Sequence, residues 1–350
     1  MRDIWNMDKR RYFMPAEWAK HLGTLIAWPT NPETWEGTEK EIRSAIAGLA
    51  AEITLHEKLY ITIKTSDSKE EIIDYLRKNN AMMERVTLLD IPNNDSWTRD
   101  YGPNYVCREE NGGAEWAINR WGYNAWGGKY PPWTQDNDFK SAFAEWIGCP
   151  ELREPGMILE GGSIDVNGEG IVLTTKSCLL NPNRNPALSQ PEIEKRLKKY
   201  LGVEDIIWIE EGIAGDDTDG HIDDFVRFID TRNIVCCYEE NRQEENFKAL
   251  DEAYNTLLHH PVLKNRGISV HKLPMPGPKY FRDFRIPASY ANFYFVNGGL
   301  LVPIFNDPMD EKVIGFLQSF RPDLKVKGIP GLDFVRGLGG IHCLTQQIYG

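Results

Sequence analysis

The sequence lacks the features that mark several large classes of protein. It has 40 Lys and Arg against 52 Asp and Glu, a formal net charge of −12, whereas binding to nucleic-acid phosphates requires basic patches. No apolar run approaches the roughly 18 residues of a membrane helix, and residues 1–6 show no apolar stretch of a secretory signal. We therefore expect a cytoplasmic protein without a nucleic-acid or membrane partner.

Cysteine is scarce as well. The six cysteines of this 350-residue chain include no C-x-x-C pair, which argues against a disulfide scaffold and a cysteine-based zinc site. The acidic balance suits a small cationic ligand, although a solvated acidic surface gives the same net charge. The 41% of hydrophobic residues is enough to fill a sizeable core.

The order of predicted elements repeats along the chain. Residues 157–175 read as two strands that turn at the Asn-Gly pair 167–168, which is a strong signal for a two-residue hairpin turn. A helix is predicted over 190–201, and 206–209 follows as a short buried strand.

Hairpin, helix and strand recur in three further places, the first without a predicted final strand. The repeats comprise the hairpins 97–119, 221–238 and 290–303, the helices 136–147, 243–259 and 310–320, and the strands 268–273 and 324–329. Four units of about 50 to 70 residues have the period of ring and array architectures.

The two ends of the chain have the pattern of a fifth unit that is split. Residues 341–348 and 22–28 read as strands, and a helix over 40–55 and a strand over 59–64 complete the unit. Pairing of the first and last strands would close a ring and remove its exposed edges. Residues 68–91 add a helix and a strand that this scheme does not place. An ordinary α+β domain is the alternative.

Each unit carries a distinctive polar side chain near the start of a hairpin or strand. They are Asp100, Glu160, His221 with Asp223, Asn292 and Cys343. On a strand, His221 and Asp223 would point to one face and place an imidazole beside a carboxylate. If the units converge on the axis of a ring, a thiol, an amide and further carboxylates would lie beside this imidazole and carboxylate. Carboxylates suit a planar guanidinium cation, on which Trp97 could stack.

The acidic segment 215–224 does not have the pattern of a calcium loop. Aligned on Gly220, an EF-hand would have Gly215 at its first position and Val226 at its twelfth, where acidic ligands are needed. We therefore predict no metal site.

Six motifs read together resemble those of one enzyme family. WTRDYGP, ILEGGSIDVNGEG, LLNPNRNP, GDDTDGHIDD, SYANFYFVNGG and GGIHCLTQQ occur in this order, and they are similar to motifs of the agmatine deiminases of the guanidine-modifying superfamily. The bacterial peptidyl-arginine deiminases share much of the pattern. The resemblance implies an α/β fold, a five-bladed propeller of pseudo-fivefold symmetry, formed by residues 1–350 as a single domain.

The resemblance also implies roles for the residues at the reacting end of the substrate. Cys343 would attack the guanidinium carbon, and His221 would act as general acid and base. Asp100 and Asp223 would hold the guanidinium nitrogens, with Glu160 supporting His221.

Other positions would line the site or bind the far end of the substrate. Trp97 would line it, and Asp217 matches a position that binds the substrate's far amine and is often Glu. Asn292, from the predicted convergence of the units, is a further candidate for substrate binding. Gly340 stands where agmatine deiminases typically have Asn, so both Asp217 and Gly340 depart from the family pattern.

The implied reaction is hydrolysis of agmatine to N-carbamoylputrescine and ammonia through an amidino-cysteine intermediate, a step of putrescine and polyamine biosynthesis. It requires no metal or organic cofactor. The alternatives are a peptidyl-arginine or free-arginine deiminase and a non-catalytic scaffold. The sequence leaves open whether the protein is a homo-oligomer.

Overall fold

The strands follow one pattern that recurs around the molecule. The computed structural model describes residues 11–110 and 113–350, and the strands of these residues form six sheets. In four of the sheets, two antiparallel strands are joined by a third that runs parallel to the second. These sheets are β4 (Asn104–Glu110), β5 (Gly113–Asn119) and β6 (Leu152–Arg153); β7 (Ile164–Val166), β8 (Ile171–Thr175) and β9 (Asp205–Ile209); β10 (Val226–Asp230), β11 (Asn233–Tyr238) and β12 (Ser269–Pro274); and β15 (Tyr294–Val296), β16 (Gly299–Ile304) and β17 (Lys325–Pro330).

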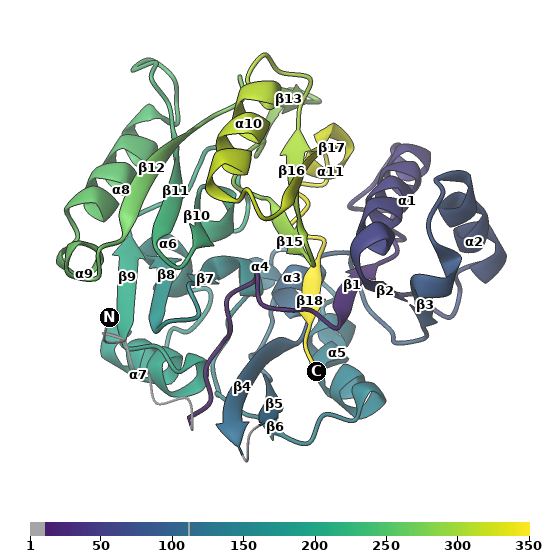
Figure 1. The fold of residues 1–350 in the computed structure, drawn as a ribbon. Helices are drawn as coiled ribbons and strands as arrows, with labels where there is room; N and C mark the ends of the chain where they lie inside the picture. The colour runs from purple at the N-terminus through teal and green to yellow at the C-terminus, as the bar shows by residue number, and fades with distance from the viewer. Residues whose placement is uncertain (1–10, 111–112) are drawn as a thin grey trace.

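A fifth sheet has the same order but combines both ends of the chain. Its strands are β18 (Gln346–Ile348), β1 (Gly23–Ala27), β2 (Lys58–Thr62) and β3 (Val86–Leu89). β18 runs antiparallel to β1, with Ile348 opposite Gly23, and β2 runs parallel to β1. In Figure 1 the yellow β18 lies beside the purple β1 accordingly. β3 extends this sheet by one strand, which places the segment that the sequence scheme left over.

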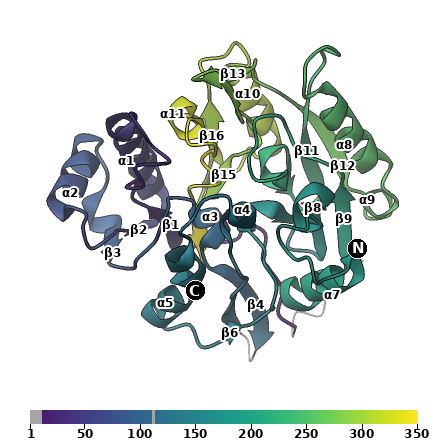
Figure 2. The ribbon, with the colours of Figure 1, turned by 180° about the vertical axis from the view of Figure 1, so that it is seen from behind.

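Helices connect the second and third strands within these units. The longer helices are α1 (Glu39–His56), α2 (Lys69–Lys78), α5 (Thr134–Ile147), α7 (Gln190–Leu201), α8 (Phe247–His259) and α10 (Asp310–Phe320). Shorter elements are α3 (Thr98–Tyr101), α4 (Ala125–Gly128), α6 (Lys176–Leu179), α9 (Pro261–Asn265) and α11 (Leu332–Val335), the 3₁₀ turns η1 (Met83–Arg85), η2 (Gly161–Ser163) and η3 (Ile222–Asp224), and the hairpin β13 (Lys279–Phe281) with β14 (Phe284–Ile286). The longer helices lie toward the outside, and α3 and α4 lie near the middle in Figures 1 and 2.

Local sequence explains where α7 begins and ends. Ser189 and Glu192 form a capping box at its start, and Gly202 adopts the left-handed conformation (φ 67°) just beyond its end. Its buried residues, Ile193, Leu197 and Leu201, recur every four positions and form the stripe that packs on the protein core. No helix of the described residues is both long enough and apolar enough to cross a membrane.

All four predicted hairpins begin four to seven residues later than the sequence indicates. The strand expected from residue 97 starts at Asn104, because residues 98–101 form the helix α3. The strand expected from His221 starts at Val226, because Ile222–Asp224 form the turn η3. The prediction that His221 and Asp223 share a face of a strand is therefore wrong, and both side chains are positioned by a turn instead.

Candidate active site

The predicted site residues lie in the short segments that precede the hairpins. Asp100 lies in α3, Glu160 immediately precedes η2, and Asp223 lies in η3 next to His221. Cys343 lies in the loop that leads into β18. Short turns therefore position these side chains, and the regular strands behind the turns form the rigid support.

Gly162 marks the point where three of these side chains converge. A Cβ atom built on Gly162 would lie 2.6 Å from His221 Nδ1, 3.0 Å from Asp100 Oδ1 and 3.0 Å from Asp223 Oδ2. Its backbone N–H donates a hydrogen bond to Asp100 Oδ1 at 3.0 Å. The imidazole and both carboxylates thus surround a space that only glycine leaves open.

His221 is fully buried and available for proton transfer. Its Nδ1 lies 3.7 Å from Asp100 Oδ1, and neither ring nitrogen has a hydrogen-bond partner among the described residues. Glu160 lies close to His221. One carboxylate oxygen of Glu160, Cys178 Sγ and one ring nitrogen of His221 lie within 4.8 Å of one another. The Glu160 carboxylate itself accepts a hydrogen bond from Arg184 Nε at 2.7 Å.

Cys343 faces acidic groups and an amide. Its Sγ lies 3.3 Å from Asn292 Nδ2, which also donates to Asp224 Oδ1 at 3.0 Å. Sγ and one oxygen each of Asp223 and Asp224 lie within 4.8 Å of one another. Burial raises the pKa of the Cys343 thiol well above its usual value, and the charges of Asp223, Asp224 and Asp100 raise this pKa further. Without a ligand Cys343 is therefore a thiol at neutral pH.

Asp223 and Asp224 are adjacent, but their pKa values are driven apart. Burial alone would raise the pKa of Asp223, yet the hydrogen bond and charge of His342, with His221 and Arg227, lower it below its usual value. Burial and the charge of Asp223 raise the pKa of Asp224 well above its usual value. Asp223 thus ionises more readily than Asp224.

Asp100 is held in place by two donors. In addition to the Gly162 N–H, Trp126 Nε1 donates to its Oδ2 at 2.9 Å. Burial raises the pKa of Asp100, whereas the proximity of His221 lowers it. A planar cation that enters beside Asp100 and Asp223 would find carboxylate oxygens with little access to water.

Asn292 explains the glycine at position 340. A Cβ atom on Gly340 would lie 2.3 Å from Asn292 Oδ1, and this oxygen also accepts a hydrogen bond from the His342 N–H at 2.9 Å. The amide of Asn292 therefore fills the space that a side chain at position 340 would need. Trp97, which is buried, plays a similar part at Gly339, where a Cβ would lie 2.3 Å from its ring.

Asp217 lies away from this cluster and has other partners. Lys129 Nζ lies 3.4 Å from Asp217 Oδ1 and 3.0 Å from Asp219 Oδ1, and the hydroxyl of Tyr130 donates to the Asp217 carboxylate. The Tyr130 ring packs against Trp126 at 5.7 Å between centroids. The segment from Trp126 to Tyr130 therefore links Asp100 to Asp217.

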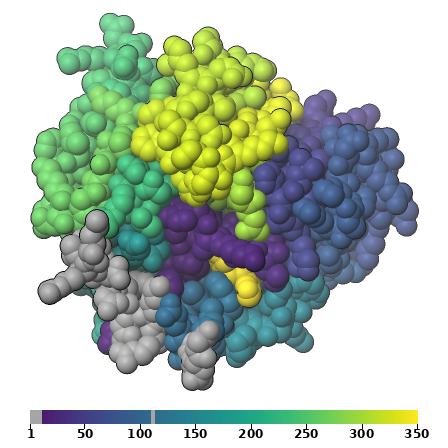
Figure 3. All heavy atoms as spheres, in the orientation of Figure 1, coloured from purple at the N-terminus to yellow at the C-terminus, as the bar shows by residue number. Residues whose placement is uncertain are grey.

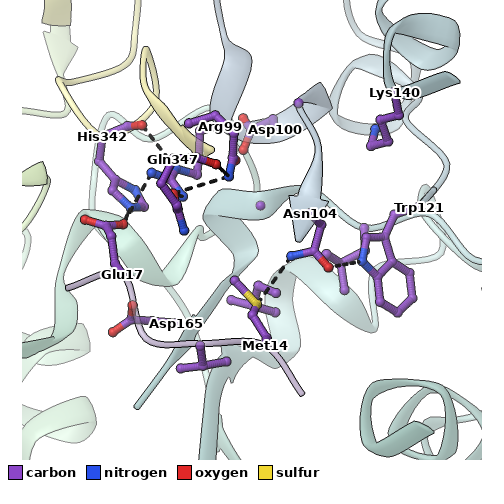
Figure 4. Close-up of a pocket in the computed structure, with 16 residues that line it drawn as sticks. Met14, Glu17, Arg99, Asp100, Asn104, Trp121, Lys140, Asp165, His342 and Gln347 are labelled. Atoms are coloured by element: carbon purple, nitrogen blue, oxygen red, sulfur yellow. Dashed lines mark hydrogen bonds and ion pairs between the residues drawn. The ribbon is translucent and has the colours of Figure 1, made fainter. Parts of the chain in front are cut away.

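Sequence reasoning missed several residues that the structure brings to the site. They are Glu17, Trp126, Lys129, Asp224 and His342. Asp224 and His342 are chain neighbours of predicted residues, which was the available signal, whereas nothing local marks Glu17. Figure 4 shows Glu17, His342, Arg99 and Asp100 lining one pocket.

Among the described residues, two groups of side chains have donor atoms close enough to bind a metal ion. They are Glu160, Cys178 and His221, and Asp223, Asp224 and Cys343. Both groups include residues that the predicted chemistry already uses. That the site works without a metal ion therefore stays a prediction.

The raised pKa of Cys343 has a measurable consequence. Because only the thiolate is alkylated, we expect the rate of Cys343 modification by iodoacetamide in the free enzyme to rise with pH beyond the range of an ordinary cysteine, whose pKa is about 8.5. Asp223→Asn removes a negative charge and should move this profile to lower pH. Mass spectrometry of the modified peptide, with Cys343→Ser as the blank, measures it. A midpoint below that of free cysteine would contradict this electrostatic account.

Comparisons with known proteins place the chain in a family. The model of the Porphyromonas-type peptidyl-arginine deiminase family matches residues 13–348. The curated agmatine deiminase of Pseudomonas fluorescens is 35% identical over 358 residues, and that of Stutzerimonas stutzeri is 35% identical over 357, each alignment covering 96% of this chain and 95% of the relative. A solved structure of the agmatine deiminase of Enterococcus faecalis is 31% identical, with a TM-score of 0.88, and covers 99% of this chain and 98% of that one.

These matches, with the thiol and imidazole just described, define a hydrolase that acts on C–N bonds of amidines, with a mixed α/β fold. More particularly, the chain belongs to the Porphyromonas-type peptidyl-arginine deiminase family. The resemblance inferred from the six motifs is thereby confirmed.

Proposed function

We propose that this protein is an agmatine deiminase, which hydrolyses agmatine to N-carbamoylputrescine and ammonia. The observation that carries the proposal is the convergence of an imidazole and two buried carboxylates on Gly162, next to the Cys343 thiol. An acidic pocket of this kind suits a planar cation. Full-length similarity to enzymes named agmatine deiminases supports the choice of substrate.

The first half of the reaction forms a covalent intermediate. Asp100 and Asp223 accept hydrogen bonds from the guanidinium nitrogens and orient its carbon toward Cys343 Sγ. The bound cation offsets the negative charges around Cys343, which lowers the pKa of the thiol, and the thiol proton passes to His221 as the thiolate forms. Sγ attacks the guanidinium carbon, and His221 protonates the nitrogen that leaves as ammonia. An amidino-thioether on Cys343 remains.

The second half releases the product. His221, which has given up its proton, deprotonates a water that attacks the amidino carbon. The tetrahedral intermediate expels the Cys343 thiolate, its hydroxyl proton passes to that thiolate, and the carbon is left with a C=O bond, as N-carbamoylputrescine. His221 releases the proton it took from water to solvent. These steps need no metal or organic cofactor.

We also propose that the repeated sheets are the blades of a five-bladed α/β propeller of pseudo-fivefold symmetry, and that the chain is one domain. The recurring strand order and the pairing of β18 with β1 support this interpretation. We propose as well that the protein is cytoplasmic, which its six free cysteines support because such a compartment is reducing, and the net charge of −12 supports a small cation as its partner.

Ammonia release from agmatine, free arginine and an arginyl peptide tests the proposed function. We expect agmatine to have the largest kcat/KM, and absence of turnover on agmatine would overturn the proposal. Free arginine is the second candidate substrate. Lys129, which contacts Asp217, offers the positive group that the carboxylate of arginine would need.

Variants at Lys129 and Asp217 distinguish the two substrates. If Asp217 receives the distal ammonium of agmatine, that ammonium competes with Lys129, so Lys129→Met should lower KM for agmatine roughly fivefold and Asp217→Asn should raise it by a similar factor, as expected for about 1 kcal/mol. Lys78→Met, which removes an exposed lysine paired with Asp74, is the matched control. A loss of arginine turnover in Lys129→Met, with agmatine kinetics unchanged, would favour arginine instead.

A further inference from the structure

His342 lies buried between two carboxylates. Its Nδ1 is 2.5 Å from Asp223 Oδ2, and its Nε2 is 2.6 Å from Glu17 Oε2. Ionised carboxylate oxygens only accept hydrogen bonds, so both ring nitrogens must donate and the ring is an imidazolium. Figure 4 shows the ring of His342 directed at Glu17, with Arg99 beside them.

The charges around His342 balance one another. Glu17 Oε2 also lies 3.3 Å from Arg99 Nη2 and 3.2 Å from Arg227 Nη2, and Arg227 Nε lies 3.3 Å from Asp165 Oδ1. Three cations, Arg99, Arg227 and His342, thus face three carboxylates, Glu17, Asp165 and Asp223, and all six side chains are buried. A buried cluster of this kind depends on each member, because removal of one charge leaves its partner uncompensated.

The contact with His342 determines how Asp223 can meet a ligand. Asp223 Oδ2 is bound by His342, whereas Oδ1 is buried and has no hydrogen-bond partner within the described parts of the chain. Asp223 therefore keeps one oxygen, Oδ1, available to a ligand.

Glu17 brings the N-terminal stretch into this arrangement. Its Oε1 accepts a hydrogen bond from the Phe295 N–H at 2.9 Å, which fixes the carboxylate that contacts His342. The purple N-terminal stretch lies across the middle of the face shown in Figure 3. The reacting site thus depends on a residue 325 positions from His342.

We propose that His342 is a positioning residue that holds Asp223 ionised and turned, so that Oδ1 alone accepts a hydrogen bond from the substrate's guanidinium, and that Glu17 holds His342 as an imidazolium. The proposal rests on the proposed function in taking a guanidinium as the ligand. It adds two residues that do not touch the substrate.

A matched pair of substitutions separates the two contacts of His342. The amide nitrogen of Asn takes the place of Nδ1, and that of Gln takes the place of Nε2. His342→Asn can therefore keep a donor to Asp223, whereas His342→Gln keeps only a donor to Glu17. We expect His342→Gln to lower kcat/KM for agmatine by about 10²-fold, mainly through KM, and His342→Asn to remain within about tenfold of the wild type.

The pH profile provides a readout that a merely structural role would not change. Loss of the donor from His342 raises the pKa of Asp223, so the acid limb of kcat/KM should move to higher pH in His342→Gln and less in His342→Asn. The other groups that face Asp223 are His221, Arg227, Asp224, Asp100 and Cys343. They are present in both variants, so the difference between the variants belongs to His342.

Alkylation of Cys343 tests the proposal without turnover. 2-Chloroacetamidine carries a planar amidinium cation, and iodoacetamide is neutral. The ratio of the rate with 2-chloroacetamidine to the rate with iodoacetamide should be at least tenfold lower in His342→Gln than in the wild type. The decrease in His342→Asn should be smaller. Glu17→Gln, which keeps the shape of the side chain, should lower the ratio as well and serves if the His342 variants do not fold.

The outcomes for the two proposals are distinct. Absence of agmatine turnover by the wild type, with a high amidinium preference retained, would overturn the substrate and leave the positioning role supported. Rate ratios in His342→Gln and Glu17→Gln equal to that of the wild type, in folded protein, would overturn the positioning role.

Discussion

Cys343→Ser is expected to lower kcat for agmatine by about 10³-fold or more, with no loss of folded structure. The serine hydroxyl would occupy the place of Sγ, but it ionises far less readily among Asp223, Asp224 and Asp100, even with a bound cation to offset their charge. Ammonia release measures the rate, and thermal unfolding checks the fold. A non-catalytic scaffold would have no turnover to lose.

Cys149→Ser is the control for this substitution. Cys149 is partly buried, and its thiol donates to the Glu151 carbonyl at 3.4 Å, away from the residues around Gly162. Its replacement should leave kcat unchanged.

Acid quenching of the wild type during turnover should trap an adduct of agmatine minus ammonia on Cys343. Full activity of Cys343→Ser would rule out the covalent mechanism.

Gly162→Ala is expected to have the second largest effect. The new methyl group would lie 2.6 Å from His221 Nδ1 and 3.0 Å from oxygens of Asp100 and Asp223, so these side chains must move. A displacement of about 1 Å at a catalytic group typically costs about 10²-fold in rate. We expect a fall in kcat/KM of at least this size, with a loss of about 1 to 3 kcal/mol in the free energy of unfolding from overpacking.

Gly315→Ala separates the effect of the site from that of the residue type. Gly315 lies in α10, and apart from its chain neighbours and the backbone of its own helix no described atom lies within 4 Å of a Cβ built on it. Alanine should leave kcat/KM unchanged there and stabilise the helix by about 0.5 to 1 kcal/mol. If Gly162→Ala kept the kcat/KM of the wild type, catalysis would not need His221, Asp100 and Asp223 in their observed positions.

Regular elements were well predicted where local signals decide them. The helix expected over 190–201 coincides with α7, because its capping box and its terminal glycine are written in adjacent residues. The Asn-Gly pair at 167–168 does lie between β7 and β8, but residues 167–170 separate the two strands, so the two-residue turn predicted there is wrong. The helix α3 was missed, since its four residues contact other elements more than one another: Thr98 Oγ1 donates to the carbonyls of Leu25 and Leu344.

The site was predicted as a set of residue types but not as an electrostatic arrangement. The sequence places Asp223 and Asp224 side by side and cannot indicate which is ionised. That difference depends on His342, 119 positions away from Asp223. Glu17 and Lys129 were beyond reach for the same reason, because their partners are set by the folded chain and not by neighbouring residues.

The distance along the chain between Glu17 and His342 has a consequence for folding. Contacts of large sequence separation form slowly, because the loop between them must be closed before they stabilise anything. During synthesis Glu17 leaves the ribosome long before His342, Cys343 and β18, so Glu17 and the edge of β1 that pairs with β18 must wait without these partners while the intervening sheets form. Completion of the reactive centre is therefore a late event in the folding of this enzyme, and partly synthesised chains hold no assembled thiol site.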